Sequence, residues 1–149
     1  MKIPENVELA IKEFVEACKE KFKDNLVSIV LFGSYARGNF KETSDIDLLV
    51  IVKELPESVW ERDKMIEEIL WKILLEKHIK ISPILVEPEE IKMHAKWPNP
   101  IFYGIILGYN ILFDKEFFES IIGIVRERIK KKDPIYIEGD KKWRLMKLI

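Results

Sequence analysis

Hydrophobic residues follow first a helical and then an extended pattern at the start of the chain. Five apolar residues repeat at steps of four, three, four and four, on one helical face: Val7, Ile11, Phe14, Cys18 and Phe22. Pro4 suits the first turn of this helix, which we expect to run to about Lys23. The run 26–32 is almost continuously apolar and has the length of a strand. Such a run predicts a central strand that is buried on both faces.

A second strand, a helix and a third strand are predicted next. Residues 45–52 end in an apolar run without a polar face, so this strand should also be central. A helix over 56–77 and a strand over 79–86 follow, and Pro83 in that strand favours an edge position or a bulge. This order of elements predicts an α/β (α+β) fold, in which helices cover one side of a small mixed sheet.

Shorter elements are predicted in the rest of the chain. Pro88 starts a short helix that the prolines of 98–100 interrupt. Residues 101–107 are apolar enough for a packed helix or a strand, and 109–113 suit a short extended piece. We expect Asp114 to cap a final helix. The residues that this helix should bury are Phe117, Phe118, Ile121, Ile122, Val125 and Ile129.

The chain has 149 residues, a length that suits one domain with a sizeable core. We expect this domain to span 1–133, with a core of about 5–90 and a helical extension of about 88–132. The tail, 134–149, ends in apolar residues that are unusual for a free terminus. We expect it to dock on its own domain or on another subunit, which makes a homodimer one candidate assembly.

The composition is that of an ordered globular protein, with 48% hydrophobic and 34% charged residues. A single cysteine, Cys18, excludes an internal disulfide and a cysteine-based zinc cluster, and its place on an apolar helical face indicates a core residue. No apolar stretch is long enough to span a bilayer, and the first residues lead into an amphipathic helix rather than a signal peptide. We therefore expect a cytoplasmic protein that does not enter a membrane.

The net charge is −1, yet the segment 126–147 carries nine basic and four acidic residues. This basic end could attract nucleic acid or an acidic partner, but we interpret it as a solvated face. The four tryptophans could stack on a nucleic-acid base, and we interpret each as a packing residue. They are Trp60, Trp71, Trp97 and Trp143.

A glycine-serine turn is followed closely by two carboxylates in the first half of the chain. The first strand stops at Gly33, and the turn offers backbone N–H groups, the Ser34 hydroxyl and the Arg37 guanidinium, all of which suit a polyphosphate. Asp45 and Asp47 would share one face of the second strand, about 7 Å apart. That spacing can hold divalent cations between the carboxylates and a triphosphate.

These motifs resemble the nucleotidyltransferase superfamily that includes DNA polymerase beta, and most closely its small minimal nucleotidyltransferases. The shared pattern is an apolar residue, Gly-Ser, about ten residues, and then Asp-apolar-Asp-apolar. Here Phe32, Gly33 and Ser34 precede ten intervening residues and the run 45–48. The resemblance implies the nucleotidyltransferase fold, with Gly33 and Ser34 holding the triphosphate.

The resemblance also implies the chemistry of the acid pair. Asp45 and Asp47 are the predicted catalytic residues and metal ligands, because carboxylates tolerate a triphosphate only with cations between them. Mg²⁺ is the expected ion and Mn²⁺ an alternative, with ATP or another nucleoside triphosphate as substrate. Arg37 either contacts a phosphate or is a loop arginine that faces solvent.

The family pattern is incomplete on the third predicted strand. Active members usually carry a third carboxylate there, where this chain has Ser82 or Pro83; Glu87 at the strand end is a weak substitute. Three interpretations stay open. The enzyme works with two acids and a water or substrate oxygen, it takes a carboxylate from elsewhere, or it binds nucleotide without turnover.

Two functions follow from the resemblance. The first is a metal-dependent enzyme that transfers a nucleoside monophosphate, AMP from ATP, to a hydroxyl of a protein or small molecule. Minimal members often act beside a helical partner of the HEPN type, as an antitoxin that adenylylates it. The alternative is a catalytically degenerate, antitoxin-like module that binds nucleotide and a protein or RNA partner.

Overall fold

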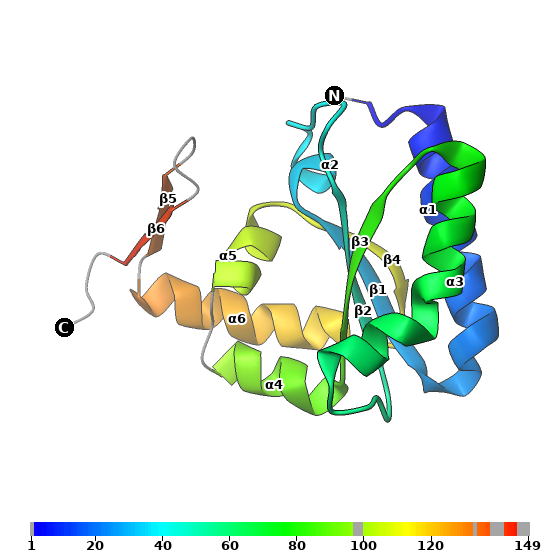
Figure 1. Cartoon of the computed structure of the whole chain (residues 1–149). Helices are drawn as coiled ribbons and strands as arrows, with labels where there is room; N and C mark the ends of the chain where they lie inside the picture. The colour runs from blue at the N-terminus through cyan, green and yellow to red at the C-terminus, as the bar shows by residue number, and fades with distance from the viewer. Residues whose placement is uncertain (1, 97–99, 133, 138–141, 146–149) are drawn as a thin grey trace.

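The computed structural model describes residues 2–96, 100–132, 134–137 and 142–145, with the arrangement drawn in Figure 1. Its elements, in chain order, are α1 (Glu5–Phe22), the 3-10 turn η1 (Lys23–Asn25), β1 (Leu26–Phe32), α2 (Ser34–Arg37), β2 (Ile46–Val52), α3 (Val59–Lys77), β3 (Ile81–Val86), α4 (Pro88–Lys96), α5 (Pro100–Leu107), β4 (Asn110–Asp114), α6 (Phe118–Lys132), β5 (Pro134–Ile137) and β6 (Lys142–Leu145). The predicted order of helices and strands up to residue 132 is confirmed.

Four strands form a mixed sheet in the order β3-β2-β1-β4. The strand β1 pairs antiparallel with both β2 and β4, whereas β2 and β3 are parallel. The two central strands are the two continuous apolar runs, because only strands covered on both faces bury every side chain. Pro83 lies in β3, at the edge of the sheet, as predicted for a residue that cannot donate to a ladder.

Helices cover both faces of the sheet, so the expectation of a one-sided cover is wrong (Figure 1). One core packs α1 and α3 against alternate residues of the central strands, such as Leu48 and Val50. The other packs α4, α5 and α6 against the intervening residues, such as Leu49 and Ile51. The segment predicted as a helical extension therefore completes the sheet's second layer.

Local signals set the helix ends. The Ser58 hydroxyl accepts a hydrogen bond from the backbone N–H of Glu61 at the start of α3. His78 ends this helix in the left-handed conformation, with φ 56° and its N–H bonded to the Leu74 carbonyl. Asp114 accepts hydrogen bonds from three backbone N–H groups at the start of α6, as predicted.

Cys18 is fully buried, and burial raises the pKa of its thiol to about 12, so its interpretation as a core residue is confirmed. Trp60 and Trp71 are 65% and 54% exposed, so their interpretation as packing residues is wrong. The side chains of Trp97 and Trp143 lie outside the described residues. Among the helices that the structure describes, none is long and apolar enough to cross a membrane.

The tail contains two strands that the sequence pattern did not indicate, β5 and β6, which pair antiparallel as a separate two-stranded sheet. The apolar segments of the tail are too short, and too often interrupted by charged residues, for the sequence pattern to predict strands. The expected docking of the tail depends on side chains that lie outside the described residues.

Candidate active site

The site begins where β1 ends, at Gly33. This residue has φ 76° and ψ −159°, a conformation that is essentially restricted to glycine. A Cβ built on Gly33 would collide with the Asp47 carboxylate oxygen Oδ2 and lie 3.1 Å from its Cγ. The Asp47 carboxylate therefore packs directly over the Gly33 backbone, in space that any side chain would fill.

The sheet holds Asp47 in this position. Asp47 is the second residue of β2, paired with Phe32 of β1 on one side and with Ser82 of β3 on the other. It is half-buried and shares a strand face with Leu49, toward α4, α5 and α6. Asp45 is exposed and precedes the strand, although the sequence predicted that the strand starts there. The structure thus joins the glycine turn to the second acid, whereas the first acid is exposed just before the strand.

The turn after Gly33 is a single helical turn, α2, as predicted. The Ser34 carbonyl accepts hydrogen bonds from the N–H groups of Gly38 and Asn39, at 2.9 and 3.1 Å. Gly38 closes the turn at φ 81°, in the left-handed region that favours glycine. Tyr35 is buried and stacks on Phe40, with ring centroids 4.4 Å apart. This stack anchors the turn and leaves the Ser34 side chain half-buried beside Gly33.

Arg37 is half-buried and runs along Gly108, at the turn from α5 to β4. A Cβ on Gly108 would lie 3.0 Å from the Arg37 Cγ and 3.3 Å from its Cα. The sequence analysis did not single out Gly108, although a glycine between an apolar helix and a strand is a signal for close backbone approach. The predicted phosphate contact of Arg37 stays a prediction.

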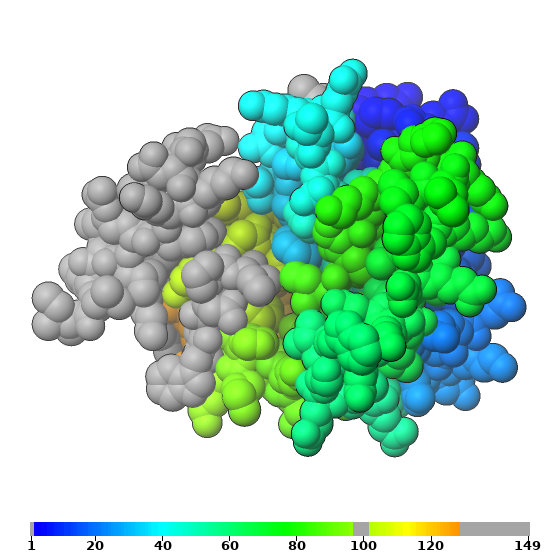
Figure 2. Space-filling model, in the orientation of Figure 1, coloured from blue at the N-terminus to red at the C-terminus, as the bar shows by residue number. Residues whose placement is uncertain are grey.

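Ser44 organises the loop that leads to the acids. Its hydroxyl accepts a hydrogen bond from the Lys41 N–H at 2.7 Å, and its own N–H donates to the Lys41 carbonyl at 3.0 Å. This loop and the surface of α3 and β3 lie next to each other on one face of the molecule, in cyan and green (Figure 2). Asp45 follows this loop directly and precedes β2.

The expected third carboxylate is missing from β3 at the position beside Asp47. Ser82 is the β3 partner of Asp47, and the strand alternation places both side chains on the same face. Within the described part of the chain, no group of three acidic, histidine or cysteine side chains could hold a metal ion. The pair Asp45 and Asp47 would thus supply two protein ligands.

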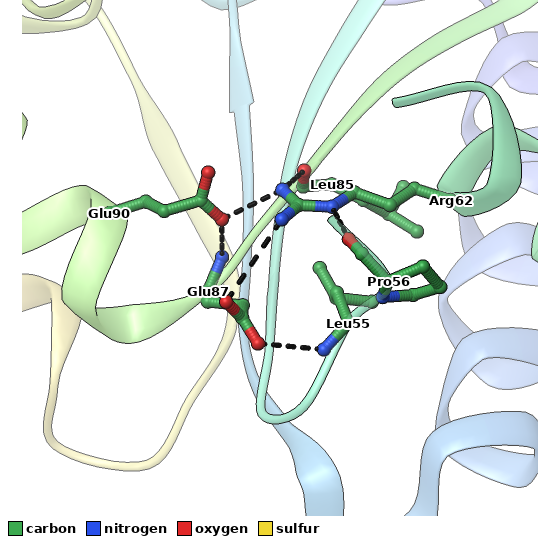
Figure 3. Close-up of polar contacts among 6 residues, drawn as sticks. All are labelled: Leu55, Pro56, Arg62, Leu85, Glu87 and Glu90. Atoms are coloured by element: carbon green, nitrogen blue, oxygen red, sulfur yellow. Dashed lines mark hydrogen bonds and ion pairs between the residues drawn. The ribbon is translucent and has the colours of Figure 1, made fainter. Parts of the chain in front are cut away.

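Glu87 has a structural role at the other end of β3 (Figure 3). It lies five residues beyond Ser82, about 16 Å along the strand. Its carboxylate accepts a hydrogen bond from the Leu55 N–H at 2.8 Å and lies 4.0 Å from the guanidinium of buried Arg62. Arg62 also pairs with Glu90 at 2.7 Å. The idea that Glu87 replaces the third acid is therefore wrong.

The residues present fit a hard cation bound together with a triphosphate. Carboxylate oxygens are the ligands that Mg²⁺ takes in proteins, and a bound nucleotide and water can complete its octahedron. The Gly33 backbone leaves room for the Asp47 carboxylate, and α2 presents its first turn beside it. The arrangement can hold a polyphosphate next to two acids.

Comparison with known proteins agrees with this geometry. The profile described as nucleotidyltransferase domain matches residues 11–101, which include β1, α2, β2 and β3. The chain belongs to this nucleotidyltransferase family. Its predicted fold and its predicted class of activity, nucleotidyl transfer, are thereby confirmed.

Several relatives come from Methanocaldococcus jannaschii. One, which carries the provisional name protein adenylyltransferase MJ1305, is 43% identical over 140 residues, 93% of this chain and 94% of the relative. A second, provisionally named protein adenylyltransferase MJ0141, is 45% identical over 75 residues, half of this chain and 74% of the relative. The strong match to the first covers nearly the whole nucleotidyltransferase chain.

Solved structures share the nucleotidyltransferase fold. The spectinomycin adenyltransferase AAD(9) from Enterococcus faecialis, solved with ATP and spectinomycin, has a TM-score of 0.56 at 17% identity, over 84% of this chain and 65% of that protein. The toxin-antitoxin complex MntA-HpeT, as a D39ED41E mutant, has a TM-score of 0.50 at 13% identity, over 83% of this chain and 92% of that one. At these sequence identities, the structural similarity shows a shared fold.

Proposed function

We propose that this nucleotidyltransferase transfers AMP from ATP to a hydroxyl of a protein acceptor. The observation that carries the proposal is the contact of the Asp47 carboxylate with Gly33, which joins the acid pair to the glycine-serine turn. The provisional name of the relative that is 43% identical over 93% of the chain supports a protein as acceptor and AMP as the transferred group. A small-molecule hydroxyl is the other acceptor class that the fold accommodates.

Each residue of the site has a proposed role. Gly33 lets the backbone approach the triphosphate, and Ser34 donates its hydroxyl and N–H to a phosphate oxygen. Asp45 and Asp47 hold Mg²⁺, or Mn²⁺ in its place, and Arg37 adds a phosphate contact. When bound, the metal supplies positive charge to the phosphate oxygens and to the attacking and leaving oxygens.

The transfer itself replaces the phosphoanhydride bond between the α- and β-phosphates of ATP with a phosphoester bond to the acceptor. The acceptor oxygen forms a bond with the α-phosphorus, and the bond from that phosphorus to the bridging oxygen breaks. Pyrophosphate leaves with the electron pair, and the hydroxyl proton passes to water or to a carboxylate. The chain's contribution is mainly to position the triphosphate and the acceptor.

The resemblance to minimal nucleotidyltransferases suggests a HEPN-type helical protein as the acceptor and partner. A direct test incubates the protein with α-labelled ATP, Mg²⁺ and candidate acceptors, including the product of any adjacent gene that encodes a small helical protein. We expect label on the acceptor with the wild type, and loss of that label with Asp47→Asn or with EDTA. Asp24→Asn, which changes an exposed acid in η1 outside the site, is the matched control and should keep the activity.

A second function is favoured by Ser82, which stands beside Asp47 where active members carry an acid. The protein would then bind nucleotide and a protein partner without turnover, as an antitoxin-like module. Nucleotide binding that depends on metal, without label on any acceptor, would support this function over the enzyme. The preserved Gly33 and acid pair favour the enzyme, because a binding module does not need two metal ligands.

A further inference from the structure

An apolar groove lies between α3 and the edge strand β3, outside the acid site. Its volume is about 650 Å³, and none of its described lining residues is Asp45 or Asp47. Trp60 and Trp71 of α3 line it, together with Ile81 and Pro83 of β3. Both tryptophans are more than half exposed, and the Lys64 ammonium lies 3.7 Å from the Trp60 ring centroid. Such a surface is costly to expose and typical of recognition.

The outer edge of β3 offers main-chain hydrogen-bonding groups along this groove. Arg62, on α3, donates from Nη1 to the Leu85 carbonyl at 3.2 Å, so this carbonyl points away from β2. Alternate residues of a strand point their main-chain groups to the same side, so those of Ile81 and Pro83 also face outward. Proline fits this position, because the ladder with β2 needs no N–H from an outward-facing residue; the open edge therefore offers the Pro83 carbonyl but no donor there. Arg62 occupies one end of this edge and leaves the end near Ile81 open.

A strand added to this edge would face both the groove and the acid site. Ile81 and Leu85 belong to the core on the α3 side, whereas Ser82 faces the other side with Asp47. Side chains of an added strand would alternate in the same way. Half would enter the groove, and half would lie beside Ser82, about 10 Å from β2 at two strand spacings. A hydroxyl-bearing side chain there lies on the same face of the sheet as Asp47.

The groove also has the length and charge for a short peptide. Trp60 and Trp71 are eleven residues apart on α3, about 16 Å, which equals about five residues of extended strand. Its charged lining residues balance, with Asp63 and Glu67 against Lys64 and Lys80. A balanced lining suits a peptide and disfavours a nucleic acid, which needs a basic surface.

We propose that β3 and the tryptophan groove bind an extended segment of the acceptor protein as an added strand, which presents its hydroxyl to Asp45 and Asp47. The inference rests on the proposed protein adenylyltransferase function and names how its acceptor is held. A strand-adding site uses main-chain hydrogen bonds for affinity and side-chain pockets for specificity.

The probe is a peptide array in which a central tyrosine, serine or threonine is flanked by alternating apolar and polar residues. The array is incubated with the full chain, α-labelled ATP and Mg²⁺, and labelled peptides are then measured in solution. We expect Trp60→Ala and Trp71→Ala to raise the KM for such a peptide about tenfold and leave the KM for ATP unchanged. Leu75→Ala, an exposed α3 residue that does not line the groove, is the matched control.

A scan of N-methylated peptides tests the strand geometry without turnover. Binding to Asp47→Asn is followed by fluorescence anisotropy, with one backbone N–H of the peptide methylated at a time. We expect loss of binding at every second position, because only alternate amides of an added strand face β3. Uniform or absent effects of methylation would overturn the inference, as would unchanged KM values in both tryptophan variants.

The remaining outcomes separate this inference from the proposed function. Transfer that depends on Asp47 but labels only folded proteins and no peptide would overturn the added strand and keep the enzyme. A dimer in solution that Trp60→Ala dissociates would show that a second copy occupies the groove, and would also overturn the inference. Peptide binding with the alternating pattern but no transfer would support the strand site and contradict the enzyme.

Discussion

At the scale of single residues, the contact between Gly33 and Asp47 decides what the site can hold. The glycine conformation, φ 76° and ψ −159°, brings the end of β1 under the Asp47 carboxylate. A side chain at residue 33 would displace Asp47, because the carboxylate fills the space of the absent side chain. This packing explains why a glycine stands next to the acid of the neighbouring strand.

Gly33→Ala tests that packing. The added methyl group collides with Asp47 and forces a conformation that costs about 1–3 kcal/mol in a residue with a side chain. We expect the rate of label transfer to fall by about a hundredfold or more, while circular dichroism still shows a folded protein. Gly123→Ala, on α6 where an added Cβ meets nothing within 4 Å, is the control. Full activity in Gly33→Ala would contradict the packing argument.

Ser82→Asp tests the incomplete acid set. Ser82 is paired with Asp47 and faces the same side, so an aspartate there adds a carboxylate next to the acid pair. We expect faster Mg²⁺-dependent transfer, by about tenfold or more, because a positioned base contributes to proton removal. The measurement is kcat with a fixed acceptor, and Ile84→Asp, two residues along the same face, is the control. A slower Ser82→Asp enzyme would show that the serine itself has a role in turnover.

At the same scale, the sequence predicted a candidate site but not its contacts. The structure brings Gly33 next to Asp47, as the two motifs suggested, because they lie on two adjacent strands. The approach of Gly108 to Arg37 was missed, since it joins segments that are far apart in the chain. The exposure of Trp60 and Trp71 was also missed, because composition predicts that large aromatic residues are buried.

At the scale of elements, Asp114 joins β1, β4 and α6. Its carboxylate accepts the hydroxyl hydrogen bond of buried Ser28 at 2.5 Å and those of three backbone N–H groups that start α6. Partial burial works to raise the pKa of Asp114, but these four hydrogen bonds outweigh it and lower the pKa. The ionised carboxylate therefore stabilises the fold.

Asp114→Ala should lower the free energy of unfolding by about 1 kcal/mol at neutral pH, through loss of the helix cap. A lowered pKa in the folded state gives stability that is complete above the unfolded pKa, near 4, and is lost as the pH falls through the folded value. The difference between wild type and variant should therefore shrink in acid. Urea unfolding at neutral and acidic pH measures it, with exposed Glu119→Gln as control. A difference that does not depend on pH would contradict the role of the ionised carboxylate.

Strands and helices were predictable where one local signal dominates. The runs that became β1 and β2 are continuous because both faces are buried, and Ser58 and Asp114 mark helix starts by their side chains. The one-sided cover was a wrong inference from the order of the first six elements, which includes only α1 and α3 as long helices. Tertiary packing of α4, α5 and α6 decides the other face.

At the scale of the whole molecule, a four-stranded sheet lies between two layers of helices, with a hydrophobic core on each of its faces (Figure 1). The sheet holds Asp47 between a glycine turn and the edge strand β3, where we propose that nucleotide and acceptor meet. The proposed nucleotide side is formed by Gly33, α2 and the acids. The acceptor side is proposed along β3 and the groove beside α3.

The most direct measurement of the central claim is metal-dependent nucleotide binding, since it needs no acceptor. Mn²⁺ bound to the protein is followed by electron paramagnetic resonance, with and without a non-hydrolysable ATP analogue. We predict that the analogue creates a tight Mn²⁺ site in the wild type, and that Asp45→Asn and Asp47→Asn each weaken it about tenfold or more. Glu76→Gln, which changes an exposed acid at the end of α3, should bind like the wild type. Equal Mn²⁺-nucleotide binding by the wild type and both aspartate variants would contradict the account.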